Sequence, residues 1–239
     1  MLINLTNLTK IKIFLVFFIK FFLLQNVKFH KYLIKNFKIS FSQVFQDLFV
    51  LYFSENKKRG IFIEIGGGDG KIISNSYLLE KKYKWTGIIC EPNIFLQNKI
   101  KINRKCKLEK KPLYYKCKEK ITFFLNEDPY QSSTKKINKS KKIILNAICL
   151  NHLFYKYKLS LKKIDYISID TEGTEFEILK NFNFKKFNVK IFSIEHNFDT
   201  AKRNKIFKLM SKNGYKRVYK FFSYMDDWYI KYNRNEKFI

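Results

Sequence analysis

Proline and glycine are scarce in this sequence, and so are the residues that build metal sites and disulfide frameworks. Three prolines and eight glycines among 239 residues, beside 46% hydrophobic residues, exclude a low-complexity chain and leave enough apolar material for one α/β domain. Only three histidines are present, and no C-x-x-C pair occurs among the four cysteines, Cys90, Cys106, Cys117 and Cys149. We therefore expect neither a zinc site nor a disulfide, and interpret the cysteines as reduced thiols of a cytoplasmic protein.

Acidic residues and arginine are also few. The chain has 48 basic and 20 acidic residues, a net charge of +28, and almost all of its basic residues are lysine. Such a charge favours nucleic acid or an anionic membrane as a partner, but specific recognition of phosphates and bases favours arginine. A genome rich in A and T is an alternative explanation of the excess of lysine, because A/T-rich codons encode lysine, asparagine, isoleucine, phenylalanine and tyrosine.

The N-terminal part is a strongly apolar block, IKIFLVFFIKFFLL at residues 11–24, followed by basic residues up to Lys35. Lys12 and Lys20 interrupt this block, which leaves it shorter than the roughly 18–20 apolar residues of a spanning helix. Three interpretations remain open: a signal anchor, an interfacial helix on an anionic membrane, and an N-terminal helix packed on the domain. We treat residues 1–39 as an extension that can attach the protein, through residues 11–35, to the cytoplasmic face of a membrane.

From residue 40 onward, short apolar runs alternate with helical patterns, which is typical of a parallel sheet with crossover helices. We expect strands at Ile61–Ile65, Thr86–Glu91, Lys120–Leu125, Tyr166–Asp170, Val189–Glu195, Arg217–Phe222 and Trp228–Tyr232. We expect helices at Phe41–Ser54, Ile73–Lys82, Ile94–Asn103, Asn146–Tyr157, Glu175–Asn181 and Ala201–Lys212. Residues 126–142 are predicted to form a loop, and residues 40–239 a single domain.

A glycine-rich turn follows the first expected strand, in the sequence IFIEIGGGDGKIISNSYLLE at residues 61–80. Such a turn lets backbone N–H groups approach a ligand at the carboxyl edge of a parallel sheet. Gly66, Gly68 and Gly70 give the spacing G-x-G-x-G, whereas the dinucleotide fingerprint is G-x-G-x-x-G. Lys71 stands where the third glycine of that fingerprint belongs, so the turn favours S-adenosylmethionine over a dinucleotide.

Acidic residues mark the ends of the other expected strands. Glu64 precedes the glycines, where it can meet the amino or sulfonium group of S-adenosylmethionine but would repel a pyrophosphate. Glu91 ends the next strand in GIICEPN, placed to accept both hydroxyls of a ribose. Asp170 ends a third strand in IDYISIDTEGTEFEIL, and the stretch IFSIEHN ends a fourth with Glu195 and His196. Because parallel strands end on one side of a sheet, we expect these residues to share one rim.

The motifs SQVFQDLF, FIEIGGGDGKIISNSYLLE, WTGIICEPN, IDYISIDTEGTEFEIL, IFSIEHN and NGYKRV occur in this order between about residues 40 and 233. Together they resemble the FkbM-type family of S-adenosylmethionine-dependent methyltransferases. The resemblance implies an α/β, Rossmann-like class I methyltransferase fold: a seven-stranded, mostly parallel sheet with an antiparallel last strand and helices on both faces. It also implies O-methylation of a hydroxyl on a sugar, a glycan or a related metabolite.

Carried over position by position, the resemblance places the donor site on a small set of residues. The family's acidic and glycine-rich loop corresponds to residues 64–70, its acidic-proline pair to Glu91 and Pro92, and its Asp-x-Glu-Gly-x-Glu motif to residues 170–175. The expected cofactor contacts are Gln43, Glu64, Gly66, Gly68, Asp69, Gly70, Glu91, Pro92 and Asp170. Gln43 belongs to a front pattern with Ser42 and Asp47, whereas residues 110–120 lack the small-acidic ending expected near the adenine.

The reaction requires a group that takes the proton of the acceptor hydroxyl. His196, Asp170 and Glu195 are the candidates, and Mg²⁺ bound by Asp170, Glu195 and Asn197 is a further hypothesis. The loop at 126–142, with Tyr130, Ser132 and Ser133, is predicted to close over the acceptor. Two other functions stay open: an RNA methyltransferase, which the net charge suggests, and a membrane-tethered binding protein without turnover.

Overall fold

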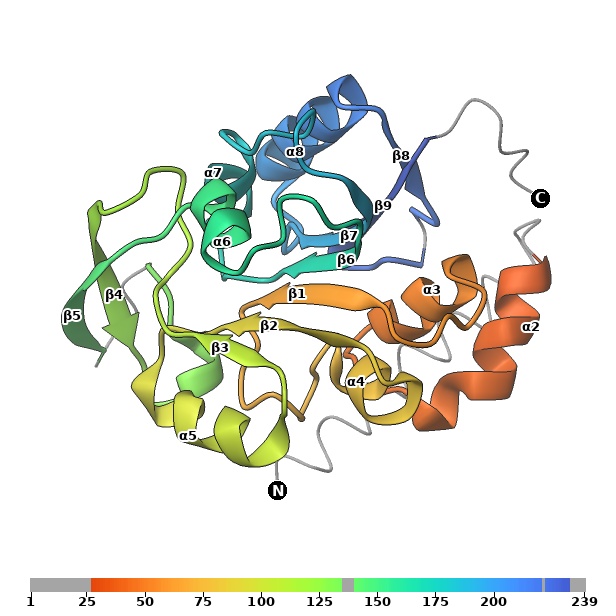
Figure 1. Cartoon of the computed structure of the whole chain (residues 1–239), viewed down its shortest axis with the longest axis horizontal. Helices are drawn as coiled ribbons and strands as arrows, with labels where there is room; N and C mark the ends of the chain where they lie inside the picture. The colour runs from red at the N-terminus through yellow and green to blue at the C-terminus, as the bar shows by residue number, and fades with distance from the viewer. Residues whose placement is uncertain (1–26, 135–139, 221, 233–239) are drawn as a thin grey trace.

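A seven-stranded sheet forms the centre of the molecule in the computed structural model, which describes residues 27–134, 140–220 and 222–232 (Figure 1). Its strands are β1 (Ile61–Ile65), β2 (Thr86–Cys90), β3 (Lys107–Glu109), β6 (Ile164–Ile169), β7 (Val189–Glu195), β8 (Tyr215–Val218) and β9 (Asp226–Lys231). The spatial order is β3-β2-β1-β6-β7-β9-β8, and β9 is antiparallel to both of its neighbours. The order reverses direction between β1 and β6. This topology confirms the Rossmann-like fold that the resemblance implied.

Helices cover both faces of the sheet, as Figure 1 shows. One face carries α2 (Val27–Asn36), α3 (Gln46–Phe53), α4 (Tyr77–Tyr83) and α5 (Ile94–Asn103), and the other carries α6 (Leu150–Lys156), α7 (Glu175–Leu179) and α8 (Thr200–Lys212). Successive side chains of a strand point to opposite faces. In β1, Ile63 and Ile65 therefore pack with α6–α8, whereas Phe62 packs with α2–α5. Glu64 points to the same face as Phe62, and its side chain therefore lies among the residues of α2–α5 and their loops.

Several predicted elements have the bounds that the structure shows, namely β1, β7, α5 and β4 (Lys120–Leu125). Three predicted helices, α3, α4 and α6, begin later than their apolar patterns suggest. Phe45 and Ile73 have positive φ values of 64° and 54°, so α3 starts at Gln46 and α4 at Tyr77. The strand predicted at 217–222 ends at Val218, because Tyr219 also has a positive φ, of 50°.

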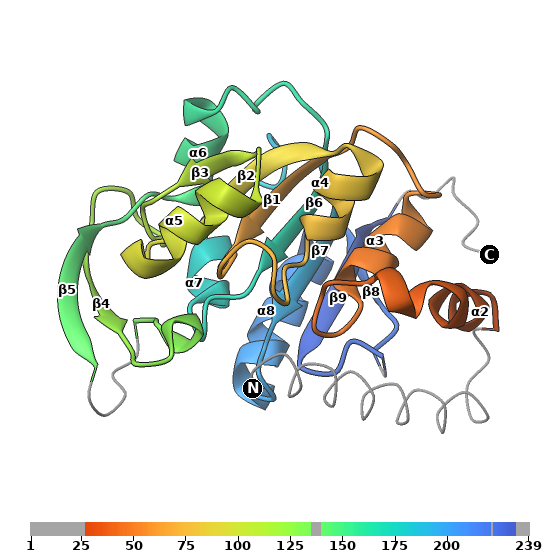
Figure 2. The same cartoon turned by 90° about the horizontal axis from the view of Figure 1, so that it is seen from below.

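An arm, defined here as residues 112–149, projects from the main sheet between β3 and α6 (Figures 1 and 2). It contains an antiparallel pair of strands, β4 and β5 (Lys141–Asn146), and a short 3₁₀ helix, η2 (Pro129–Gln131). β5 was not predicted: its first two residues were assigned to a loop, and Asn146 to the start of α6. The N–H of Ile148 donates to the carbonyl of Pro112, and the carbonyl of Ile148 accepts from the N–H of Tyr114, which closes the base of the arm.

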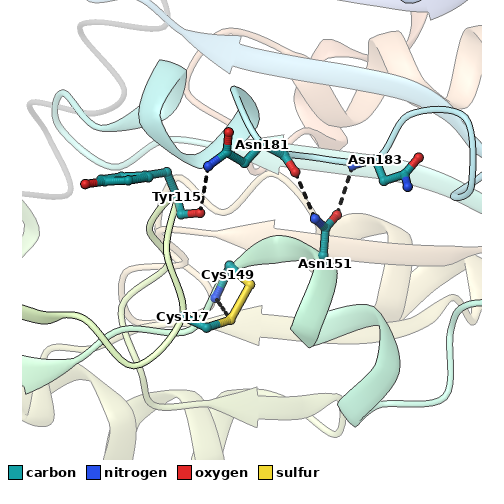
Figure 3. The surroundings of a disulfide bond; sticks show 6 residues. All are labelled: Tyr115, Cys117, Cys149, Asn151, Asn181 and Asn183. Atoms are coloured by element: carbon teal, nitrogen blue, oxygen red, sulfur yellow. Dashed lines mark hydrogen bonds between the residues drawn. A yellow bond between two sulfur atoms is a disulfide. The ribbon is translucent and has the colours of Figure 1, made fainter.

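The expectation of four reduced cysteines is wrong. A disulfide joins Cys117 and Cys149, whereas Cys90 and Cys106 are free (Figure 3). The two strands of the arm bring the bonded residues together, although 32 positions separate them in the sequence. Disulfides are typical of oxidising compartments, so the cysteines no longer support the cytoplasmic assignment.

The ends of the arm are also fastened to the neighbouring loop by asparagine side chains. Asn151 at the start of α6 donates to the carbonyl of Asn181 at 2.8 Å and accepts from the N–H of Asn183 at 2.9 Å, as Figure 3 shows. Asn181 in turn donates to the carbonyl of Tyr115 at 3.3 Å. The base of the arm is therefore held both covalently and by hydrogen bonds.

The apolar block at residues 11–24 lies outside the described residues. The first described helix, α2, packs on the domain: Phe29 is fully buried, stacks on Tyr219 at a centroid distance of 4.2 Å, and meets Trp228 edge-on. Within the described ranges, no helix is long and apolar enough to cross a membrane.

Candidate active site

A cavity of about 480 Å³ runs along the carboxyl ends of the parallel strands. This volume is within the usual range for small-molecule and cofactor sites, about 300–1,000 Å³. In spatial order, its wall is formed by residues that follow β3, β2, β1, β6 and β7, respectively 111–113, 91–92, 66–68, 170–172 and 195. All three prolines of the chain, Pro92, Pro112 and Pro129, line it. The cavity therefore lies at the topological switch point, where open α/β sheets bind their ligands.

Close contacts with neighbouring parts of the fold leave no room for side chains in the glycine turn at residues 66–68. Gly66 has a φ of +83°, and a Cβ there would lie 1.6 Å from the carbonyl oxygen of Asp170. A Cβ on Gly67 would lie 2.3 Å from Ile89, and one on Gly68, with a φ of +55°, 3.0 Å from the ring of Tyr130. Neighbouring strands thus exclude side chains from this turn, and the exposed backbone faces the cavity.

Glu91 is the buried carboxylate on the donor side of this turn. It accepts the N–H of Gly68 at 3.1 Å on one oxygen and the N–H of Asn93 at 2.9 Å on the other. Burial raises the pKa of Glu91 to about 7, although these two hydrogen bonds act in the opposite direction. Glu91 lines the cavity, and the two N–H groups fix the orientation of its carboxylate.

Glu64 does not line the cavity. Its carboxylate accepts from the hydroxyls of Ser74 and Ser76 and from the N–H of Asn75, and Arg104 lies 3.6 Å away. Burial raises its pKa, against the lowering effect of the Arg104 guanidinium. Glu64 therefore anchors the segment between the glycine turn and α4, and the expected contact with the donor's amino or sulfonium group is not what the structure shows.

Asp69 and Gly70 also support the turn from outside the cavity wall. One oxygen of Asp69 accepts the N–H groups of Lys71 at 2.8 Å and Ile72 at 2.7 Å. Gly70 has a φ of +77°, and its carbonyl accepts from Arg104 at 3.0 Å. Both residues act on the cavity by fixing the path of the backbone.

The pattern of Ser42, Gln43 and Asp47 likewise contains one residue that lines the cavity and two that support the loop around it. Gln43 lines the cavity, whereas Asp47 is buried and accepts from the Ser40 hydroxyl and the N–H groups of Phe41 and Ser42. The Ser42 hydroxyl accepts from the N–H of Asp47 in return. This reciprocal arrangement precedes α3 and holds the loop that carries Gln43.

The far end of the cavity is acidic. Asp170, Glu172 and Glu195 each offer a carboxylate oxygen, and these oxygens lie within 4.8 Å of one another. Burial and the neighbouring Glu195 raise the pKa of Asp170 well above its ordinary value. Burial and Glu172 raise the pKa of Glu195 to about 8. At neutral pH this end therefore holds a carboxyl group that can exchange a proton.

His196 lies behind the cavity wall, although its neighbours Glu195 and Asn197 line it. Its Nδ1 accepts the N–H of Phe198 at 3.1 Å, which leaves Nε2 as the donor to the carbonyl of Asp226 at 3.0 Å. Burial lowers its pKa, so the ring is neutral at pH 7. Both ring nitrogens are thus occupied, and the hypothesis that His196 takes the acceptor's proton does not fit this geometry.

We expect His196→Ala to act on stability and to leave the pH dependence of turnover in place. The substitution removes the partners of a buried N–H and a buried carbonyl, which should lower the free energy of unfolding by about 2–4 kcal/mol. Urea unfolding would measure this loss, and kcat/KM between pH 5 and 9 would be recorded well below the unfolding midpoint. Disappearance of an inflection below pH 6.5, the side to which burial moves the pKa of His196, would restore His196 as the base.

The cavity is also lined by residues of the arm, namely Asp128, Pro129, Tyr130, Ser132 and Thr134, and the closure of the loop at 126–142 over the acceptor stays a prediction. The side-chain N–H₂ of Asn93 donates to the carbonyl of Pro129 at 3.0 Å and to the hydroxyl of Ser132 at 3.1 Å. The Tyr130 ring packs over Gly68, whereas the backbone of Ser133 pairs with Phe124. Residues 135–139 of the predicted loop lie outside the described residues.

Sequence reasoning missed the apolar part of the wall. Ile121 and Phe123 of β4 line the cavity, together with Leu113 after β3 and Met225 before β9. The alternation of Ile121, Phe123 and Leu125 was visible in the predicted strand, but nothing in the sequence shows that β4 leaves the main sheet and folds over the rim. Residues 111–113, which belong to the stretch 110–120 that lacks the expected small-acidic ending, also line the cavity.

The strand order 3-2-1-6-7-9-8 with one antiparallel strand is that of a Rossmann-like class I methyltransferase fold, and the cavity lies at its carboxyl rim. The sequence matches the family described as methyltransferase FkbM domain over residues 64–217. The chain belongs to this family and is a methyltransferase, and the family implies S-adenosylmethionine as the methyl donor.

The chain was also compared with curated proteins and with solved structures. The search of curated proteins found no match. Among solved structures, the chain is similar to a precorrin-6Y C5,15-methyltransferase from Geobacter metallireducens GS-15, with 13% identity and a TM-score of 0.43. That alignment covers 72% of this chain and 71% of the other. No statement about the reaction rests on this likeness.

Proposed function

We propose that this methyltransferase transfers a methyl group from S-adenosylmethionine to a hydroxyl oxygen of a sugar, glycan or related metabolite. The observation that carries the proposal is the division of one cavity into two halves. Glu91 after β2 and the bare turn at 66–68 after β1 lie on one side of the switch between β1 and β6, and Asp170 after β6 and Glu195 at the end of β7 lie on the other. The first half suits a nucleoside, and the second suits the removal of a proton.

The donor half offers each group that the nucleoside requires. Glu91 can accept both ribose hydroxyls, and the backbone at 66–68 leaves room for the methionine part. Leu113, Ile121 and Phe123 provide an apolar wall for the adenine ring. A dinucleotide would bring its pyrophosphate between Glu91 and Asp170, where two carboxylates oppose it.

Glu195 is the group that we assign to the acceptor's proton. When bound, S-adenosylmethionine supplies a methyl group on a positively charged sulfur, and the acceptor oxygen must lose its proton as it bonds to that methyl. Glu195 lies in the cavity wall, and its pKa of about 8 lets it accept a proton near neutral pH. Asp170, with its pKa raised in the same surroundings, orients the hydroxyl beside it.

The two alternative functions fit this geometry less well. RNA would bring phosphate groups to an acceptor half that contains Asp170, Glu172 and Glu195. Repulsion there opposes the attraction that the net charge of +28 provides elsewhere. A non-catalytic binding protein has no use for buried carboxylates with raised pKa values, which cost folding free energy when ionised.

The sequence left open whether the reaction also uses Mg²⁺. The oxygens of Asp170, Glu172 and Glu195 are close enough to hold one small cation. We propose that transfer does not require it, because Glu195 already accepts a proton near pH 8. Full activity after EDTA treatment is expected, and a loss that Mg²⁺ alone restores would show the reverse.

Glu91→Gln tests the donor half. An amide cannot accept from both ribose hydroxyls with the strength of a carboxylate, so affinity for S-adenosylhomocysteine should fall about 10- to 100-fold. Glu177→Gln is the matched control, because Glu177 lies on α7, outside the cavity wall, and pairs with Lys180. Calorimetric titration would show the difference, and equal affinities in the two variants would remove Glu91 from the donor site.

Donor binding should also release a proton. The pKa of Glu91 is about 7 in the free protein, and hydroxyl donors favour its charged form, so binding lowers this pKa. Below pH 7 the group must ionise to bind, and affinity should fall by up to about tenfold per pH unit. Calorimetry in two buffers of different ionisation enthalpy measures the release, which should be larger at pH 6.5 than at pH 8.5 and absent in Glu91→Gln.

A further inference from the structure

Two carboxylates at the acidic end of the cavity, those of Asp170 and Glu195, lie close together in a strongly basic protein. Although the chain has 48 basic residues, no ion pair within residues 27–134, 140–220 and 222–232 includes Asp170 or Glu195. Lys202, whose charge acts on Glu195, donates instead to Glu175 at 2.8 Å. These two carboxylates therefore need a positive charge from a source other than the described lysines of this chain.

Glu195 supplies a second, independent sign of a ligand. Its side chain is 4% exposed and lines the cavity, and its Oε2 has no hydrogen-bond partner among the described residues. A buried carboxylate oxygen without a donor is costly, and native proteins seldom keep one unless a ligand or an ordered water satisfies it. The missing partner must approach from the cavity side and must carry an N–H, an O–H or a metal ion.

We propose that Asp170, Glu172 and Glu195 bind an ammonium group of the acceptor, which makes the substrate an amino alcohol. An ammonium group has three N–H donors, and three carboxylates within 4.8 Å of one another can receive them. The sulfonium of the donor has no N–H, whereas its α-ammonium group does, and S-adenosylhomocysteine retains that group. An amine probe that binds together with S-adenosylhomocysteine is therefore held by carboxylate oxygens that the donor leaves open. Because a carboxylate has two oxygens, Glu195 can contact both the ammonium and the reacting hydroxyl.

The position of the cluster sets the geometry of the acceptor. Asp170 and Glu195 end adjacent strands, and the glycine turn that borders the donor half contacts Asp170 directly. The amine therefore binds beside the carbon that carries the hydroxyl, as in a vicinal amino alcohol such as an amino sugar. This inference rests on the proposed function and narrows its acceptor class.

Matched pairs of small probes test the inference on the full chain saturated with S-adenosylhomocysteine in EDTA. The probes are 2-aminocyclohexanol against 1,2-cyclohexanediol, and glucosamine against glucose and N-acetylglucosamine. Saturation-transfer NMR should show the amine of each set binding about tenfold or more tightly than its neutral partners. Glu195→Gln should abolish this preference, whereas the control Glu177→Gln should keep it.

Each other outcome overturns the inference in a recognisable way. Equal binding of amines and neutral probes, or no binding of any amine while S-adenosylhomocysteine binds, rules out an ammonium site. Binding of Mn²⁺ that Glu195→Gln removes, seen by electron paramagnetic resonance, assigns the cluster to a metal. A selective loss of S-adenosylmethionine over S-adenosylhomocysteine in Glu195→Gln assigns it to the sulfonium. Failure to bind S-adenosylhomocysteine at all contradicts the proposed function itself.

Discussion

Glu195→Gln is expected to lower kcat by about 10²- to 10⁴-fold, the usual contribution of a general base. Glutamine has nearly the same shape, so the side chain should stay in the cavity wall, but it cannot take up the proton of the acceptor. Glu195 lies in the acceptor half, away from Glu91, and the affinity for S-adenosylhomocysteine should therefore change little. Production of S-adenosylhomocysteine with an acceptor that supports the wild-type rate measures the loss.

Two comparisons make this prediction decisive. Glu177→Gln removes one charge from the surface of α7, outside the cavity wall, and should keep the wild-type rate. The pH profile of the wild type should show an inflection near pH 8, where Glu195 ionises, and the variant should lack it. A Glu195→Gln enzyme with kcat close to wild type would mean that another group accepts the proton.

Gly66→Ala should be the most destabilising small substitution in the glycine turn. A Cβ at this position would lie 1.6 Å from the carbonyl oxygen of Asp170, so β1 and β6 would have to separate. Overpacking of this kind costs about 1–3 kcal/mol, and a positive φ adds about 1–2 kcal/mol for alanine. The expected loss in the free energy of unfolding is thus about 2–5 kcal/mol, accompanied by loss of donor binding.

Gly214→Ala separates the two contributions. Gly214 has a φ of +78°, close to the +83° of Gly66, but a Cβ there meets only the flexible end of Lys231 at 3.9 Å. It should therefore show only the backbone cost of about 1–2 kcal/mol in urea unfolding. Equal losses in the two variants would mean that the contact between Gly66 and Asp170 does not determine the shape of the turn.

The sequence predicted the sheet well because its strands are apolar runs with clear ends. β1 and β7 have the predicted bounds, whereas β3 was not predicted, and the seven-stranded sheet was expected from the family resemblance. The helices α3 and α4 were placed too early because hydrophobic periodicity cannot show the positive φ of Phe45 and Ile73. Backbone turns of this kind depend on contacts that form only in the folded protein.

The site was harder to predict because a motif does not say which way each side chain points. Glu195 and His196 are adjacent, yet Glu195 lines the cavity and His196 lies behind it. Glu64 ends the same buried run that leads to the glycine turn, but it points toward α4 and Arg104. The alternation along a strand separates such neighbours, whereas only the packed structure shows which face meets the ligand.

The arm and its disulfide were beyond sequence reasoning for a related physical reason. Cys117 and Cys149 meet because β4 and β5 pair, and β5 was not recognised as a strand. The run KKIILN is short, begins with two lysines and exposes Ile144, so it lacks the alternation of a half-buried strand. The long-range pairing of β4 with β5 therefore determines both the disulfide and the position of the arm at the donor half of the cavity.

Calorimetric titration of the full chain with S-adenosylhomocysteine and, separately, with NAD⁺ tests the central claim most directly. The structure predicts one site for S-adenosylhomocysteine, weakened in Glu91→Gln, and no heat with NAD⁺. Binding of NAD⁺ in the absence of any binding of S-adenosylhomocysteine would contradict the account.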